Sequence, residues 1–149
     1  MRENKIVKRL SQYNEIIKEN DDIYRGFAKK MGLSECGLWI LYILRTEYTA
    51  PVQSAICACL YEPKQTVNSA LKKMEAEGYI ELTPGSDRRS KKISLTSQGI
   101  RLCEETVDKM IEMELDAMEA LSEEEQETFL TLFQKYTDLL KSLFKDKIR

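Results

Sequence analysis

The chain has 149 residues, of which 32% are charged and 42% hydrophobic, and its formal net charge is −2. This length is enough for one domain with a real core and no disulfides. The absence of histidine excludes His-based acid–base catalysis, Ser-His and Cys-His nucleophile pairs and every His-containing metal site. The apolar run 38–44 is far below the roughly 20 residues that a membrane span needs. With no visible signal peptide, we expect a cytoplasmic protein without a membrane partner.

The first predicted element is a long helix over residues 4–31. Its apolar face repeats in steps of three, four or seven and consists of Ile6, Leu10, Tyr13, Ile17, Tyr24, Phe27 and Met31. Gly32 is expected to end this helix, and Ser34 to cap a second one over residues 34–47. The second helix is apolar almost all round, which is typical of the buried centre of a small domain.

Residues 52–99 have the pattern of a helix, a turn, a helix and a hairpin. A short helix is expected over residues 52–59, followed by a tight turn and a second helix over 63–77. Pro63 suits the first position of that second helix, and Gly78 is a stop signal after it.

The hairpin is predicted from two alternating segments. Residues 79–83 and 92–96 each alternate apolar and polar side chains, as half-buried strands do. The connecting residues 84–87 are dense in turn formers. The sequence therefore predicts two antiparallel strands directly after the helix that ends at Gly78.

Two more helices are expected after the hairpin. Thr96 is the predicted cap of a helix over 97–120, and Ser122 to Glu125 fit the S-x-x-E capping box that opens the last helix. The last helix carries its own apolar face, formed by Phe129, Leu132, Phe133, Tyr136, Leu139, Leu140, Leu143 and Phe144. A lobe of about 65 residues cannot cover the apolar faces of both the first and the last helix, which favours a homodimer that buries them. The alternative is that the two helices pack on each other within one chain.

The charges are distributed unevenly along the chain. Residues 63–101 carry eight Lys or Arg and four Asp or Glu, a local charge of +4, whereas residues 104–127 carry one Lys and eleven Asp or Glu, a local charge of −10. A net negative charge argues against nucleic-acid binding, but phosphate contacts need only a local basic patch. The asymmetry predicts a basic surface on one part of the fold and an acidic surface on another.

Small and polar side chains form the outward face of the helix over 63–77. They are Lys64, Gln65, Thr66, Asn68, Ser69 and Lys72. Asn and Gln pair with adenine edges in the major groove of double-stranded DNA, and Lys pairs with guanine edges or phosphates. For this helix alone, a plain solvent-exposed face is an equally good interpretation.

The tip of the hairpin is strongly basic. Arg88, Arg89, Lys91 and Lys92 lie together beside Asp87. Four neighbouring cations repel one another, so the tip suits contact with phosphates or insertion of an arginine into a minor groove. Asp87 is placed to hold one arginine through a charge-assisted hydrogen bond. The alternative, a merely soluble loop, is disfavoured by the adjacent helix-turn-helix pattern.

Two segments resemble the MarR (multiple antibiotic resistance regulator) family. Residues 87–99, Asp-Arg-Arg-Ser-Lys-Lys-Ile-Ser-Leu-Thr-Ser-Gln-Gly, are similar to its wing signature D-x-R-x(3)-L-x-L-T-x-x-G, with Ile93 where that pattern usually has Leu. Residues 66–80 resemble the family's recognition helix and its run into the wing. The long first helix and the two terminal helices match in order and length, so the resemblance covers nearly the whole chain.

The resemblance implies a mainly α fold, α+β through a small β-hairpin wing, in one domain over residues 1–149. Residues 34–99 would form a winged helix-turn-helix lobe that binds DNA, and residues 1–31 and 100–149 a helical dimerisation region. The implied function is a homodimeric transcriptional regulator, a repressor, that binds a pseudo-palindromic operator with half-sites about one helical turn apart. Arg89 would be the minor-groove arginine of the wing and Asp87 its partner. Gln65, Thr66, Asn68, Ser69 and Lys72 would lie at or near the major groove.

The resemblance also implies an effector, since many members of the family respond to small aromatic or lipophilic molecules and others to oxidants. The candidate ligand-binding residues are Tyr13, Tyr24, Arg25, Trp39 and Tyr42, although core is the favoured interpretation of the aromatic ones. Cys36 is the best candidate for a thiol sensor, because the first turn of a helix can lower a thiol pKa. The oxidant-sensing subgroup carries its cysteine in the first helix, where this chain has none. Neither a cofactor nor a metal is expected.

Three other functions remain open. A winged-helix regulator of another type, such as a PadR-like or chromosome-organising protein, would place its dimer helices differently. A winged-helix adaptor that binds proteins and not DNA is disfavoured by the cationic wing. An enzyme is least expected, because the sequence has neither a Gly-rich phosphate loop nor a paired-carboxylate motif on a recognisable site.

Overall fold

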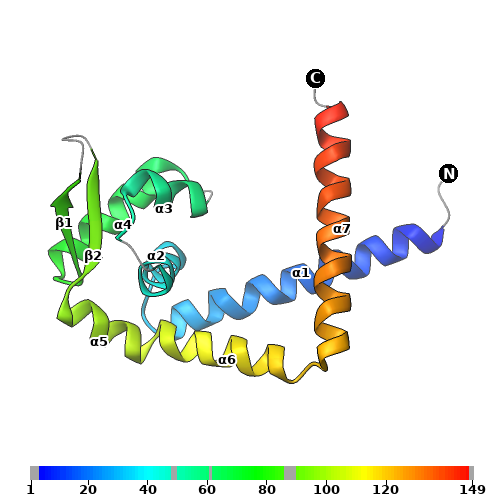
Figure 1. Cartoon of the computed structure of the whole chain (residues 1–149), viewed down its shortest axis with the longest axis horizontal. Coiled ribbons are helices and arrows are strands. Elements are labelled where there is room, and N and C mark those ends of the chain that lie inside the picture. The colour runs from blue at the N-terminus through cyan, green and yellow to red at the C-terminus, as the bar shows by residue number, and fades with distance from the viewer. Residues whose placement is uncertain (1–3, 48–49, 61, 86–89, 148–149) are drawn as a thin grey trace. The chain divides into compact units, whose positions relative to one another are not determined.

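The computed structural model describes residues 4–47, 50–60, 62–85 and 90–147 (Figure 1). The chain divides into two compact units, residues 1–108 and 109–149. Helices α1 (Asn4–Lys30), α2 (Glu35–Thr46), α3 (Gln53–Leu60), α4 (Lys64–Ala76) and α5 (Ser97–Glu105) belong to the first unit, as do strands β1 (Ile80–Pro84) and β2 (Lys91–Leu95). Helix α6 (Val107–Glu119) begins in the first unit and continues in the second, which also holds α7 (Glu123–Lys147). The predicted mainly helical fold with one β-hairpin is confirmed.

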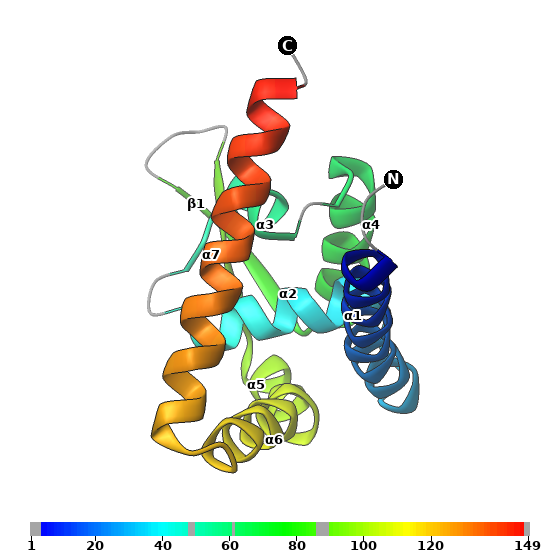
Figure 2. The same cartoon turned by 90° about the vertical axis from the view of Figure 1, so that its right-hand side faces the viewer.

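Helix α2 is the centre of the first unit. The Ser34 hydroxyl accepts a hydrogen bond from the Gly37 N–H at 3.0 Å, which confirms the predicted cap. Leu38, Ile40 and Leu41 are completely buried, and α2 contacts α1, α3, α4, α5 and β2 (Figure 2). Each such side chain contributes about 1.5–3 kcal/mol when it is fully buried, so α2 organises the elements around it.

Helices α3 and α4 form the predicted helix-turn-helix. Val67, Leu71 and Met74 lie on the buried face of α4. Pro63 stands one position before the first residue of α4 and not inside its first turn, a shift within the usual uncertainty of a helix boundary. Gly78 ends the helix with a φ of +84°, a conformation that glycine adopts without steric cost.

The hairpin packs on the connection that precedes α3. Strands β1 and β2 pair antiparallel, with Leu82 opposite Ile93. In addition, Val52 forms an isolated bridge with Lys92, and the Ile93 N–H donates to the Pro51 oxygen at 2.9 Å. The sequence suggested only a connector at Pro51, but the structure ties the wing to the start of α3 there.

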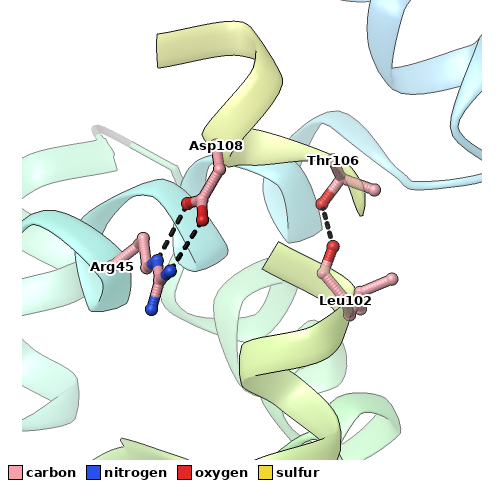
Figure 3. Close-up of polar contacts among 4 residues, drawn as sticks. All are labelled: Arg45, Leu102, Thr106 and Asp108. Atoms are coloured by element: carbon pink, nitrogen blue, oxygen red, sulfur yellow. Dashed lines mark hydrogen bonds and ion pairs between the residues drawn. The ribbon is translucent and has the colours of Figure 1, made fainter. Parts of the chain in front are cut away.

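The helix predicted over 97–120 is broken at Thr106. This residue has φ −126° and ψ −89°, and α5 ends before it while α6 begins after it. Its hydroxyl donates to the Leu102 carbonyl oxygen at 2.6 Å (Figure 3). The prediction of one continuous helix was wrong. The hydroxyl bond alone does not break a helix, since Thr137 bonds the Phe133 carbonyl oxygen in the same way inside the unbroken α7. The break is a local change of backbone conformation that apolar periodicity does not reveal.

The second unit begins at Lys109 and contains the turn between α6 and α7. The predicted capping box is confirmed, because the Ser122 N–H donates to Glu125 Oε1 at 3.0 Å and the Glu125 N–H donates to the Ser122 hydroxyl at 3.1 Å. Hydrogen bonding to Ser122, chiefly to its backbone N–H, lowers the pKa of the Glu125 carboxyl. No helix in the described ranges is long and apolar enough to cross a bilayer.

Hydrogen bonds of Thr96 and the close approach of Gly99 join the wing to the end of α4. We call this set of contacts the Thr96 lock. The Thr96 hydroxyl donates to the Gly78 oxygen at 2.6 Å and accepts from the Gly99 N–H at 3.0 Å, while the Thr96 N–H donates to the Tyr79 oxygen at 3.1 Å. A Cβ added at Gly99 would collide with that Tyr79 oxygen. The T-x-x-G part of the wing signature therefore has a structural cause, since it joins α4, β1 and α5 at one point.

We expect Gly99→Ala to lower the free energy of unfolding by about 1–3 kcal/mol, the usual cost of overpacking, because the new Cβ collides with a backbone oxygen. Urea denaturation at fixed protein concentration measures the loss. Gly26→Ala in α1 is the matched control, since a Cβ there meets nothing within 4 Å and a helical alanine should raise stability by up to about 1 kcal/mol. Equal stability of the two variants would contradict the proposed lock.

Candidate nucleic-acid interface

The outward face predicted for α4 is exposed except at Asn68, where the prediction was wrong because this side chain is half-buried. Gln65, Thr66, Ser69 and Lys72 are all exposed and lie away from the face that carries Val67, Leu71 and Met74. Small side chains at Thr66 and Ser69 let another surface approach the helix backbone closely. Gln65 and Lys72 supply longer donors on either side of them.

Lys64 and Asn68 lie on a different side of α4, at a groove. The groove has a volume of about 590 Å³ and runs between α3, α4 and the hairpin. Its lining residues are Val52, Gln53, Ser54, Cys57, Lys64, Asn68, Leu71, Lys72, Leu82, Ser90 and Lys91. The structure thus brings Lys64, Asn68 and Lys72 together with Lys91 of β2 on one concave surface, which the sequence alone did not show.

Asn68 is held in this groove with an unsatisfied oxygen. Its Oδ1 is buried, and no hydrogen-bond donor in the described part of the chain reaches it. A buried polar atom without a partner costs about 1–3 kcal/mol. The contribution of Asn68 to the stability of the fold therefore does not explain why an asparagine stands at this position.

Three lysines line the groove. Lys64, Lys72 and Lys91 are exposed, and none of them forms an ion pair within the described ranges. The neighbouring Lys73 differs, because its Nζ lies 4.0 Å from Glu77 Oε1. Three exposed cations around one groove create a positive potential suited to a polyanion.

The tip of the wing lies partly outside the described residues. Asp87, Arg88 and Arg89 belong to the segment 86–89 that the structure does not describe, so their predicted roles stay predictions. The hairpin is paired up to the tip on both sides, since the Gly85 N–H donates to the Ser90 oxygen at 2.9 Å. Lys91 follows directly at the start of β2 and is exposed.

Three of the candidate ligand-binding residues gather into one aromatic group. The Trp39 ring lies 5.0 Å from the Tyr24 ring and 5.4 Å from the Tyr42 ring, measured between centroids. Tyr13 is half-buried three helical turns earlier in α1. Arg25 is exposed and donates to Asp22 at 2.7 Å, with Glu35 at 3.4 Å. The ring contacts fit the core interpretation of the aromatic residues as well as the ligand-binding one.

The cysteines do not support a thiol sensor at Cys36. Burial raises the pKa of the Cys36 thiol, and the nearby Glu62 and Cys57 raise it further. The expectation that the helix N-terminus lowers this pKa was wrong, because burial disfavours the charged thiolate. Burial likewise raises the pKa of Cys103 to about 11. Within the described ranges all four cysteines are free, and no cluster of three or more metal ligands occurs.

The ion pair between Arg45 and Asp108 was not predicted from the sequence. Arg45 Nε donates to Asp108 Oδ1 at 2.8 Å, and Arg45 Nη2 donates to Asp108 Oδ2 at 2.6 Å (Figure 3). Both side chains are about one-third exposed or less, at 32% and 27%, and the hydrogen bond to Asp108 raises the pKa of Arg45. The residues are 63 positions apart, so no local pattern could have revealed the pair.

A buried central helix, a helix-turn-helix and a two-stranded hairpin after the second helix define a winged helix-turn-helix protein. The sequence profile of the MarR family matches residues 39–90. An uncharacterized HTH-type transcriptional regulator of Bacillus subtilis (strain 168), YwoH, is 31% identical over 98 residues, which are 65% of this chain and 70% of that protein. The chain therefore belongs to the MarR family of transcriptional regulators, as the resemblance implied.

Solved structures of the family are similar over most of the chain. The MarR family regulator NMB1585 of Neisseria meningitidis superposes with a TM-score of 0.77 at 21% identity, covering 93% of this chain and 97% of that one. The structure of MepR from S. aureus in complex with DNA gives a TM-score of 0.66 at 26% identity, covering 87% and 96% of the two chains. At 21% identity, the similarity to NMB1585 shows a shared fold and nothing more.

Proposed function

We propose that the protein is a homodimeric repressor of transcription that binds a pseudo-palindromic operator in double-stranded DNA. The observation that carries the proposal is the groove between α4 and the hairpin, in which Lys64, Lys72 and Lys91 surround Asn68. The outward face of α4 adjoins this groove. MepR, which is similar to this chain, binds DNA in a solved complex, and this supports the same partner here.

The outward face of α4 would contact bases, and the groove would contact phosphates. Helix α4 would enter the major groove, where Gln65 and Ser69 contact base edges. The phosphate backbone beside the major groove would then lie along the lysines of the groove, because phosphate contacts position a protein on the duplex. Beyond the phosphates, Arg89 would reach the minor groove from the wing.

A homodimer is supported by the apolar surfaces of α1 and α7. Helix α7 buries no residue and α1 buries only Ala28. Their exposed large apolar side chains are Ile6, Val7, Leu10, Ile16 and Ile23 in α1 and Phe129, Leu130, Leu132, Phe133, Leu139, Leu143 and Phe144 in α7. Apolar surface of this extent marks a protein interface, and a second copy of the chain is the simplest partner. Two lobes carried by one dimer would then contact two half-sites.

An effector is proposed for the aromatic group formed by Tyr24, Trp39 and Tyr42. These rings join α1 to α2, the helix on which the winged-helix lobe (residues 34–99) is built. A small aromatic or lipophilic molecule that contacts these rings would displace α2 and so lower the affinity for the operator. Release of the operator by such a molecule would relieve repression.

Removing the charge of Lys91 should weaken operator binding and reduce the slope of log K against log [salt] by about 1, because one phosphate contact is lost.

Gln65→Ala should cost about 1–3 kcal/mol of binding free energy at one base pair of the preferred site and leave the salt slope unchanged. Arg89→Ala should weaken operator binding while fold and dimer stay intact. Fluorescence anisotropy at several salt concentrations measures all three variants.

Lys141→Ala is the matched control for loss of one charge, since Lys141 is exposed on α7 and lies 3.9 Å from Asp138. Its affinity and salt slope should equal those of the unmodified protein. Equal losses of operator affinity in Lys91→Ala and Lys141→Ala would disprove the assignment of the groove as the surface that contacts phosphates. Binding to a protein partner without salt dependence would favour the adaptor instead.

Trp39 is the only tryptophan of the chain, so its fluorescence reports on the aromatic group directly. A small aromatic effector should quench or shift this emission in a saturable manner and release labelled operator over the same concentration range. Tyr24→Leu should weaken both effects together. Release of the operator with no change in Trp39 emission would place the effector elsewhere.

A further inference from the structure

Asn68 is a residue of the groove whose polarity the fold itself does not use. Its side chain lines the groove, and the buried residues Val67 and Leu71 hold the helix on which it stands. Its Oδ1 is buried, yet no donor within the ranges that the structure describes reaches it. A leucine, which has a similar shape and no polar atom, would avoid the cost of this oxygen. The fold alone therefore favours an apolar residue at this position.

Asn68 lies in a row with two lysines along one side of α4. Lys64, Asn68 and Lys72 follow one another at intervals of four residues, and all three line the groove. Residues spaced by four are neighbours on a helix surface, with about 5–6 Å between their Cβ atoms. The Cα–Cβ bonds of a helix tilt toward its N-terminus, so the Lys72 side chain reaches back over Asn68, whereas that of Lys64 leans away from it. Lys72 is therefore the lysine that the Asn68 amide is placed to hold.

Lys72 has the donors that this arrangement needs. Its side chain is exposed, and in the described parts of the chain it forms no ion pair. The ammonium group carries three N–H donors, so it can donate to the Asn68 oxygen and to a phosphate oxygen at the same time. Lys91 lines the same groove from β2. A phosphate held between Lys72 and Lys91 draws the Lys72 ammonium into the groove, where the Asn68 oxygen lies.

We propose that Asn68 is a positioning residue for DNA binding, whose amide oxygen accepts a hydrogen bond from Lys72 in the complex and holds that ammonium against one operator phosphate. The inference rests on the proposed function and deepens it. Asn68 acts through Lys72 and contacts neither a base nor a phosphate. Holding the lysine offsets part of the side-chain entropy that is lost when it binds. The unsatisfied oxygen thus lowers stability in the free protein and raises affinity in the complex, so its two effects have opposite signs.

A double-mutant cycle tests whether Asn68 acts through Lys72. Fluorescence anisotropy at several salt concentrations measures the affinity for an operator duplex selected from a random pool. The proteins are the unmodified chain, Asn68→Leu, Lys72→Met and the double variant, and Asn68→Ala removes the same oxygen without adding bulk. Lys73→Met supplies the matched control cycle, since Lys73 follows Lys72 in α4 and its Nζ lies 4.0 Å from Glu77 Oε1. Urea denaturation of every variant measures its stability.

Asn68→Leu should raise the midpoint of urea denaturation and lower operator affinity about three- to tenfold, the loss expected for one hydrogen bond. Asn68→Ala should lower the affinity to a similar extent. Lys72→Met should weaken binding and reduce the slope of log K against log [salt] by about 1. The double variant should bind as Lys72→Met alone does, because Asn68 then has no ammonium to hold. In the control cycle, the losses caused by Asn68→Leu and Lys73→Met should multiply.

Three results would overturn the inference. The first is unchanged operator affinity in both Asn68→Leu and Asn68→Ala. The second is a double variant in which the losses caused by Asn68→Leu and Lys72→Met multiply, which would show that Asn68 does not act through Lys72. The third is a fall in stability together with affinity in both Asn68 variants, which would show that the residue merely supports the fold. If the unmodified protein selects no DNA at all, the proposed function itself fails, and that outcome is distinct from the other three.

Discussion

Burial of α2 is the interaction on which the winged-helix lobe depends. Leu38, Ile40 and Leu41 are shielded completely from solvent, and five other elements pack around the helix. Helices α3, α4 and α5 and the two-stranded hairpin could not be stable alone, because short helices and an isolated hairpin need tertiary packing. The positions of α4, the wing and the aromatic group all follow from contact with this one helix.

The surface proposed for DNA is assembled around that core by a few specific backbone contacts. The Thr96 lock joins the end of α4 to the wing, and the hydrogen bond from Ile93 to Pro51 joins the wing to the start of α3. These contacts hold both sides of the groove, so Lys64 and Lys91 keep a fixed relation although they belong to different elements. A fixed arrangement of cations lowers the entropic cost of ordering them on a polyanion.

The sequence predicted those features that depend on local chemistry. The caps at Ser34, Thr96 and Ser122 and the stop at Gly78 were all correct, because each is decided within a few residues of its own position. The burial of α2 was predictable for the same reason, from an apolar run with no polar face. The outward face of α4 followed from helical periodicity.

Features that depend on distant contacts could not be predicted. The Arg45–Asp108 pair, the bridge from Val52 to Lys92 and the gathering of lysines around Asn68 each join segments that periodicity treats separately. The break at Thr106 was missed because the apolar pattern continues across it. Cys36 was misjudged for a related reason, since its helix position was visible in the sequence but its burial was not.

The most direct test of the central claim is selection of bound duplexes from a random pool at physiological salt, followed by native mass spectrometry of the purified complex. We expect an inverted repeat whose half-site centres are about 10–10.5 base pairs apart, bound by two chains. Enrichment of one asymmetric motif bound by a single chain, or no enrichment at all, would contradict it.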